Sequence, residues 1–188
     1  MLKQRLEWFE GQLDLDPHKL VFIDETGAST NLARKGGRCQ RGLRLRAGAP
    51  HGHYKTVTLV AGIRLGGLVA AKAYDRPINA ALFEEWVEQC LLPALAPGDI
   101  VVMDNLSSHK GPRVEQLIKA AGCALRYLPP YSPDMNPIEK AFSKLKAHLR
   151  KIAERTVAAL MRVLETCADI FKPAECANYF AACGYDPP

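Results

Sequence analysis

Three acidic residues are candidates for chemistry because each adjoins a segment that should be held rigidly. Asp24 closes the apolar run "KLVFIDE", Asp104 closes "GDIVVMDN", and Glu139 follows a proline-rich stretch. No cationic residue neighbours Asp24 or Asp104 in sequence. A convergent carboxylate cluster is unfavourable unless a cation neutralises it, and hard oxygen ligands favour Mg²⁺ or Mn²⁺. The three acids therefore predict a site for two such ions, which activate a water or hydroxyl and stabilise the leaving oxygen of a phosphodiester.

The stretch before Glu139 restricts the backbone unusually strongly. "PPYSPDMNPIEKAFSKLK", Pro129 to Lys146, places four prolines within nine residues. Proline limits φ and lowers the entropy of the loop, so the following helix should start in one defined position. Pro137 suits the first helical turn, with Asn136 as the cap before it. Glu139 then lies in the turn where the helix dipole favours a negative charge.

The predicted helix after this stretch has two distinct faces. An apolar stripe with helical spacing should pack on the core: Ile138, Phe142, Leu145, Leu149 and Ile152. A second stripe combines the candidate ligand with two cations: Glu139, Ser143, Lys146 and Arg150. Lys146 and Arg150 are therefore candidate contacts for a DNA backbone that runs past the metal ions. The alternative is a solvated face with a glutamate favoured by the dipole.

The remaining segments predict a mixed α/β sheet that positions the acids. Helices are expected at 1–12 (packing Leu2, Leu6 and Phe9), 78–95 (capped by Asn79), 111–122, 137–152 and 156–171. Strands are expected at 19–24, 98–105 and 123–129, with a hairpin formed by 55–64 and 67–75. The tail "CGYDPP" should be loose. Asp24 and Asp104 each end a strand apolar enough to be central, and ligands of open α/β sheets gather at the carboxyl ends of strands.

A long segment of the chain carries only positive charge. Between Thr26 and Tyr74 there is no Asp or Glu. Its first part supplies six candidate DNA contacts: Arg34, Lys35, Arg38, Arg41, Arg44 and Arg46. Such a glycine-interrupted basic segment suits an arm that lies along phosphates and releases counterions, although a solvated loop is the alternative. His109 and Lys110 follow Asp104 closely enough to contact a phosphate, but His109 is equally suited to a helix cap.

Composition places limits on the class of protein. The 188 residues are 48% apolar and 24% charged, which is typical of one globular domain. No apolar run reaches the roughly 18 residues of a membrane helix, and the N-terminus lacks the apolar core of a signal peptide, so we expect a cytosolic protein. Six cysteines without metal-ligand spacing indicate reduced thiols.

The acidic segments also resemble a known family. "FIDETGAS", "VVMDNLSSHK" and "LPPYSPDMNPIEKAFSKLK" are similar to the three acidic motifs of the DDE transposases, in the insertion-sequence branch of the mariner superfamily. "PHGHYKTVTLVAGI" fits the same branch, and 34 residues separate Asp104 from Glu139, a spacing similar to that of the superfamily. The resemblance covers about residues 18–155. It implies a ribonuclease-H-like fold, a mixed five-stranded sheet flanked by helices, with Asp24, Asp104 and Glu139 as metal ligands.

The resemblance implies an organisation and partners as well. Residues 1–18 would be an N-terminal helix and linker, 19–155 the catalytic domain, and 156–188 a C-terminal helix and tail. Full-length relatives carry a helix-turn-helix region that reads the element ends, so we expect that half to be encoded separately or joined by frameshifting. The implied partners are DNA of the element ends and of a TA target, in a homodimer or larger synaptic complex. The implied location is the cytoplasm, in association with the nucleoid.

Three other functions are compatible with parts of the sequence. Another ribonuclease-H-like nuclease, such as a hybrid-specific RNase or a junction resolvase, shares the acids and the metal but not the proline-rich third motif. A phosphatase with an aspartyl nucleophile is suggested by "VFIDETG", but Thr26 occupies the position where that class needs a second aspartate. An inactive DNA-binding remnant of a transposase is the third alternative.

Overall fold

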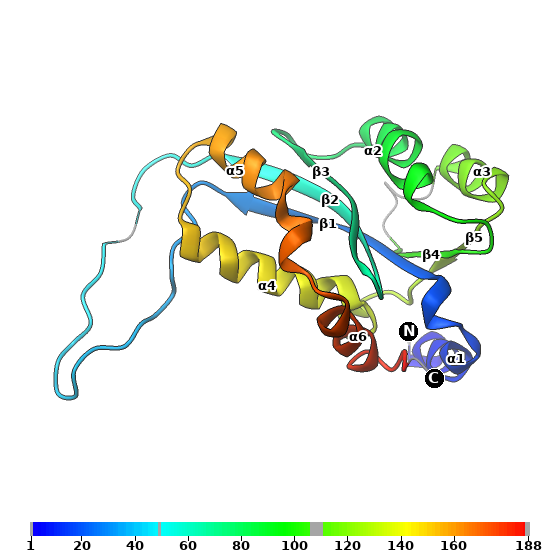
Figure 1. The fold of residues 1–188 in the computed structure, drawn as a ribbon, viewed down its shortest axis with the longest axis horizontal. Helices are drawn as coiled ribbons and strands as arrows, with labels where there is room; N and C mark the ends of the chain where they lie inside the picture. Colours follow the sequence, from blue (N-terminus) through cyan, green and yellow to red (C-terminus); the bar gives the residue numbers. More distant parts are fainter. Residues whose placement is uncertain (1, 49, 106–110, 187–188) are drawn as a thin grey trace.

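The computed structural model of the chain describes residues 2–48, 50–105 and 111–186, and its centre is a single β-sheet (Figure 1). The sheet has five strands in the order β3-β2-β1-β4-β5. The strands are β1 (Leu20–Ser29), β2 (Thr56–Arg64), β3 (Gly67–Tyr74), β4 (Ile100–Met103) and β5 (Ala124–Tyr127). β1 is antiparallel to β2 and parallel to β4, so the expected mixed five-stranded sheet is confirmed.

The central strand β1 is longer than the predicted segment 19–24. It pairs with β4 only from Leu20↔Ile100 to Ile23↔Met103, whereas its pairing with β2 continues to Ser29↔Thr56. The apolar run of β1 ends at Ile23, where its pairing with β4 also ends. Pairing with β2 keeps the backbone extended as far as Ser29. Asp24 therefore lies within the strand, as the first residue beyond the parallel ladder, and not at its end.

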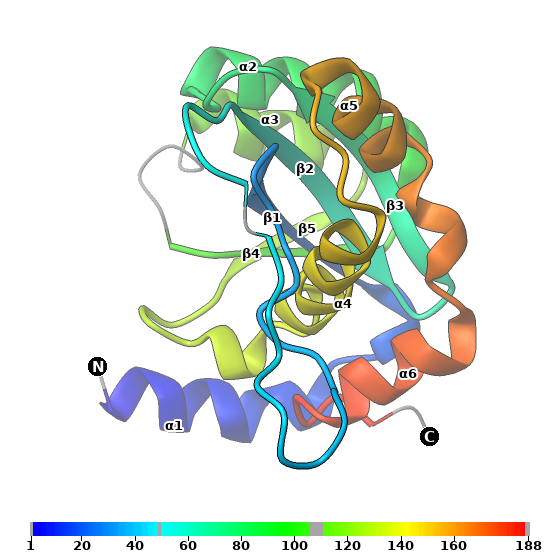
Figure 2. The ribbon, with the colours of Figure 1, turned by 90° about the vertical axis from the view of Figure 1, so that its left-hand side faces the viewer.

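Helices cover both faces of the sheet (Figure 2). One face carries α4 (Pro137–Ile152), α5 (Val157–Glu165) and α6 (Pro173–Ala181), and the other carries α2 (Ala80–Trp86) and α3 (Pro112–Ala120). Alternate residues of β1 supply the two cores: Leu20 and Phe22 pack on the first side, Val21 and Ile23 on the second. The apolar run Leu20–Ile23 at the start of β1 is what burial on both faces requires.

Two predicted helices are shorter than expected. The segment 78–95 begins as α2, capped by Asn79 as predicted, but continues through a π-helical turn at Val87–Leu91. The segment 156–171 is helical as α5 only to Glu165. Short 3₁₀ turns occupy Gln12–Asp14, Pro17–Lys19, Leu92–Ala94, Pro133–Met135 and Cys167–Ile170.

The first helix, α1 (Leu2–Gly11), packs by a different face from the one predicted. Leu2, Leu6 and Phe9 are 74%, 55% and 56% exposed, so their assignment to the core was wrong. Polar contacts hold this segment instead: Trp8 Nε1, in α1, donates to the Tyr185 hydroxyl at 2.8 Å, and Gln12 Nε2, in the 3₁₀ turn after α1, donates to the Gly184 carbonyl at 3.3 Å. The spacing of apolar residues does not predict these hydrogen bonds, because their acceptors, Tyr185 and Gly184, are distant in sequence.

The C-terminal segment is part of the core, which contradicts the prediction of a loose tail. Tyr185 is 1% exposed and its ring lies 4.9 Å from that of Phe22, centroid to centroid. Its hydroxyl donates to the Met135 carbonyl at 3.0 Å and accepts from Trp8. The helix before it, α6, was not predicted as a separate element.

We expect Tyr185→Phe to destabilise the protein by about 1–3 kcal/mol, because the substitution leaves the buried Met135 carbonyl without its donor. Urea unfolding of both proteins measures the difference. Tyr179→Phe is the matched control, since its hydroxyl donates to the half-exposed carboxylate of Glu175 and a smaller cost follows. Equal costs for the two variants would contradict a structural role for the C-terminal contact.

No helix in the described part of the chain is long and apolar enough to cross a membrane. All six cysteines are free. Burial raises the pKa of Cys167 and of Cys183 to about 11, so both behave as packing groups rather than as nucleophiles.

Candidate active site

The two aspartates lie side by side because of the strand register. Ile23 and Met103 form the last pair of the parallel ladder between β1 and β4, and each is followed directly by an aspartate. Asp24 and Asp104 are both half-buried and line one cleft of about 430 Å³. The sequence prediction that the two acids gather at the carboxyl ends of these strands therefore agrees with the geometry, although β1 itself continues.

Glu139 reaches the same cleft from a separate segment. It is an exposed residue in the first turn of α4, and its backbone N–H donates to the Asn136 carbonyl at 3.2 Å. Ile138 beside it is fully buried, which fixes the rotation of the helix. The fold thus brings the three predicted acids to one cleft, whose other lining residues are Asn105, Leu128, Pro129, Pro130, Tyr131, Ser132, Pro133 and Asn136.

Asn136 is a residue of the site that the sequence reasoning assigned to a different role. It occupies the cap position of α4, but its side chain makes no capping hydrogen bond. Its Nδ2 donates to Oδ2 of Asp24 at 3.0 Å, while Oδ1 of Asp24 accepts from the Glu25 backbone N–H at 2.7 Å. Asn136 is 3% exposed, and its Oδ1 accepts no hydrogen bond from the described residues. Two donors therefore fix the plane of the Asp24 carboxylate.

The segment 129–136, here called the proline loop, is held from outside by α1. Arg5 donates to both carboxylate oxygens of Asp134, at 3.0 and 2.7 Å, and to Ser132 Oγ at 2.9 Å. The hydrogen bonds from Arg5 hold the pKa of Asp134 below its ordinary value. Tyr185 also donates to the Met135 carbonyl. Contacts from α1 and from the C-terminal segment therefore both hold the loop that leads to Glu139.

The donor set of the cleft is suited to a divalent metal ion. Asp24, Asp104 and Glu139 offer only carboxylate oxygens, the ligands that Mg²⁺ and Mn²⁺ prefer. As the side chains lie, no three Asp, Glu, His or Cys groups of the described residues are close enough to hold an ion together. The residue types at the cleft therefore fit the ions. Among the described residues, the side chains are not already arranged as a set of metal ligands.

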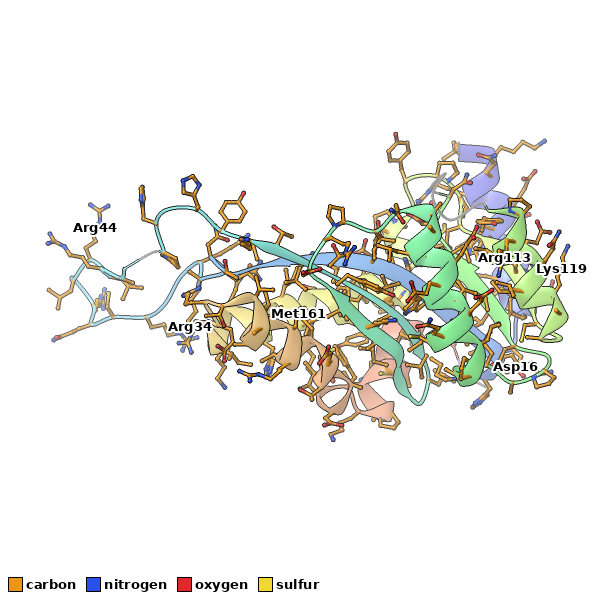
Figure 3. All side chains as sticks on the ribbon, turned by 90° about the horizontal axis from the view of Figure 1, so that it is seen from above. Asp16, Arg34, Arg44, Arg113, Lys119 and Met161 are labelled. Atoms are coloured by element: carbon orange, nitrogen blue, oxygen red, sulfur yellow. The ribbon has the colours of Figure 1, made fainter. Side chains whose placement is uncertain are left out.

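The basic arm, residues 30–48 and 50–55 of the described chain, projects from the body between β1 and β2 (Figures 1 and 3). Its six candidate DNA contacts are exposed, and Arg44 lies near the tip (Figure 3). Arg155 fastens the base of the arm, since its Nη1 donates to the carbonyls of Thr30 and Leu32 at 3.0 and 2.7 Å. The structure does not bring the arm to the cleft.

The helix α4 begins beside the cleft, which Glu139 lines, and runs toward the base of the arm (Figure 1). Glu139 lies in its first turn, and Lys146 and Arg150 follow on the stripe predicted from the sequence, both half-buried. His109 and Lys110 lie outside the described residues. Ile152, assigned to the core stripe, is 38% exposed, because α4 ends there and Ala153 takes a left-handed conformation.

Comparison with solved structures identifies the fold. A Mos1 mariner paired-end complex with Mg matches with a TM-score of 0.74 at 18% identity, covering 98% of this chain and 57% of the other. A pre-cleavage Mos1 transpososome matches with a TM-score of 0.73 at 16% identity, covering 98% and 59%. The catalytic domain of Mos1 mariner transposase matches with a TM-score of 0.64 at 14% identity, covering 99% and 85%. The expected ribonuclease-H-like fold is confirmed.

The extent of these matches differs between full chains and the isolated domain. This chain spans about three fifths of the length of the full Mos1 chains. No curated protein sequence matches it. The family profile described as DDE superfamily endonuclease matches residues 19–160, which include all three acids of the cleft. The chain therefore belongs to the DDE superfamily of endonucleases.

Proposed function

We propose that this chain is the catalytic domain of a DDE transposase of the insertion-sequence branch of the mariner superfamily. It cleaves DNA at the ends of an insertion sequence and joins the freed end to target DNA. The observation that carries the proposal is the meeting of Asp24, Asp104 and Glu139, from three separated segments, in one cleft. The Mos1 structures, described as paired-end and strand-transfer complexes, support the same reaction class.

In this proposal Asp24, Asp104 and Glu139 hold two Mg²⁺ or Mn²⁺ ions. Ions in such a site lower the barrier to phosphodiester displacement by activating the attacking oxygen and stabilising the leaving one. Structures of Mos1 with Mg and with Mn support the choice of metal. The carboxylates of this chain provide the negative charge that attracts the ions, and the paired strands β1 and β4, which hold Asp24 and lead into Asp104, are rigid supports.

The residues around the acids orient them and shape the space for the phosphate. Asn136 and the Glu25 N–H set the plane of the Asp24 carboxylate. The proline loop, clasped by Arg5 and Tyr185, delivers the start of α4 and thus Glu139 to the cleft. The same cleft serves both steps: a phosphodiester at the element end is first cut to leave a 3′-hydroxyl, which then attacks the target strand.

We propose that DNA runs from the cleft along α4, past Lys146 and Arg150, toward the basic arm. The helix has 16 residues and ends beside the anchored base of the arm. DNA on this path would meet Arg34, Lys35, Arg38, Arg41, Arg44 and Arg46. Sequence-specific recognition of the element ends is assigned to a helix-turn-helix half, and the working species to a homodimer or larger synaptic complex.

Salt dependence of DNA binding tests the role of the arm. Replacing Arg41 and Arg44 with glutamine should reduce the slope of log K against log salt by up to about 1.8, because each lost phosphate contact removes about 0.9. The slope is measured by fluorescence polarisation of a labelled duplex. A matched double variant of Arg113 and Lys119, at the opposite end of the molecule (Figure 3), should keep the wild-type slope. Equal slopes for all three proteins would contradict the proposed path.

The proposed reaction is tested with labelled duplex carrying candidate element ends, in Mg²⁺ or Mn²⁺. The expected result is metal-dependent nicking, with joined products when target DNA is present. Nicking without joining, together with cleavage of RNA–DNA hybrids or junctions, would favour another ribonuclease-H-like nuclease. The assay is repeated with a supplied helix-turn-helix half. If neither preparation cleaves while both bind DNA, the protein is an inactive remnant and the proposed activity is wrong.

A further inference from the structure

Tyr131 is an exposed aromatic residue at the edge of the cleft. It lines the cleft together with Asp24, Asp104 and Glu139, and 83% of its surface is accessible. Its φ is 55°, in the left-handed region that residues with a β-carbon rarely adopt. Pro130 precedes it, and turns that need positive φ after a proline usually place glycine or asparagine there. Tyr131 therefore combines an unfavourable backbone conformation with an aromatic ring that is exposed to water.

Local structure explains the other non-glycine residues with positive φ in the described part of the chain. Ala153 terminates α4, and its N–H donates to the Leu149 carbonyl at 2.8 Å. Ala70 lies where the register between β2 and β3 shifts, and its carbonyl accepts from Trp86 Nε1 at 2.8 Å. Tyr131 neither ends a helix nor forms a bulge, but lies in the turn at residues 130–131. The turn accounts for the positive φ, while the choice of a large aromatic residue there, at the edge of the cleft, points to a ligand contact, because strained residues cluster at ligand sites.

The backbone around Tyr131 is fixed although the side chain is exposed. Arg5 Nη1 donates to the Tyr131 carbonyl at 3.3 Å and to Ser132 Oγ at 2.9 Å. Pro130 and Pro133 restrict φ on either side. Ser132 itself is buried. The ring is therefore presented from a rigid support beside the carboxylates, which lowers the entropic cost of a contact with a ligand.

We infer that Tyr131 is a stacking surface for a nucleobase adjacent to the phosphate that reacts in the cleft. The inference rests on the proposed function, which places a DNA phosphodiester among the three acids. Because Tyr131 lines the same cleft as the acids, its ring is available to a base next to that phosphate. Aromatic side chains bind unpaired bases through their faces with little sequence preference. The proposed ligand of Tyr131 is therefore an unstacked DNA base, whereas the phosphate belongs to the site of the three acids.

Two single-stranded oligonucleotides of equal length test the inference, one of mixed sequence and one fully abasic, so that charge is constant and only the bases differ. Binding of wild type, Tyr131→Ala and Tyr131→Phe is measured by fluorescence polarisation at one salt concentration. We expect Tyr131→Ala to bind the mixed oligonucleotide about fivefold or more weakly. It should bind the abasic oligonucleotide as wild type does. Tyr131→Phe should stay within about twofold of wild type on both, since the ring face is retained.

Tyr131→Gly distinguishes the loss of the ring from a loss of folding, because it removes the ring and tolerates positive φ. It should match Tyr131→Ala in binding while melting at a higher temperature. Equal weakening on both oligonucleotides, or none on either, would overturn the stacking role. If wild type still shows metal-dependent cleavage in that case, only this inference fails. If wild type binds neither oligonucleotide and cleaves nothing, the proposed function fails with it.

Discussion

Asp104→Asn is expected to reduce metal-dependent DNA cleavage by about 10³-fold or more, because a metal ion contributes several kcal/mol of transition-state stabilisation. Asparagine keeps the size of the side chain at the end of β4 but removes the charge that attracts the cation. Product formation from the labelled duplex, at saturating Mg²⁺ or Mn²⁺, measures the loss. The same substitution should leave DNA binding by the basic arm unchanged, since none of the lining residues of the cleft belongs to that arm.

A second readout makes this prediction independent of activity. Binding of an ion to the folded state raises the melting temperature by mass action. Wild type should therefore melt at a higher temperature as Mn²⁺ is added, whereas Asp104→Asn should show little rise and be no less stable in EDTA. Asp75→Asn is the matched control, because Asp75 is an exposed carboxylate paired with Arg76 outside the cleft. Wild-type cleavage by Asp104→Asn would refute the assignment of the cleft.

The fold was predictable where sequence pattern and burial coincide. Apolar runs identify β1 and β4 because both strands are buried on both faces, and proline at position 137 marks the start of α4. The three acids could be found for the same reason: each follows or begins a segment of strong pattern. The two aspartates meet because of the parallel register of β1 and β4, which is consistent with the alternation of helices and strands along the chain, whereas Glu139 is brought to the cleft by the start of α4.

The contacts that were missed all join segments distant in sequence. Arg5 and Asp134 are 129 residues apart, and Trp8 and Tyr185 are 177 apart. No periodicity links such positions, and the exposed Leu2, Leu6 and Phe9 suggested the wrong face of α1. The predicted domain boundary at residue 18 rests on the motifs alone. The motifs carry no information on the contacts that α1 and the C-terminal segment make with the proline loop.

Asn136→Ala is expected to lower cleavage about 10- to 100-fold, the usual cost of removing a side chain that orients a metal ligand. Asn136 Nδ2 and the Glu25 backbone N–H both donate to the Asp24 carboxylate, so loss of the amide loosens the orientation of this candidate ligand. The loss should appear as a higher Mn²⁺ concentration for half-maximal activity, with a smaller change in the affinity for DNA. Cleavage rates measured across a metal titration separate the two effects.

Asn79→Ala provides the control that distinguishes positioning from helix capping. Asn79 Oδ1 accepts from the Leu82 N–H at 2.9 Å and so caps α2, whereas Asn136 makes no such bond in α4. Asn79→Ala should lose about 1 kcal/mol of stability and keep the wild-type metal titration. Asn136→Ala should shift the titration because its contact is with Asp24. If both variants lose stability alike and neither shifts the metal titration, Asn136 is a structural residue, and the rigidity of Asp24 comes from its strand and the Glu25 N–H.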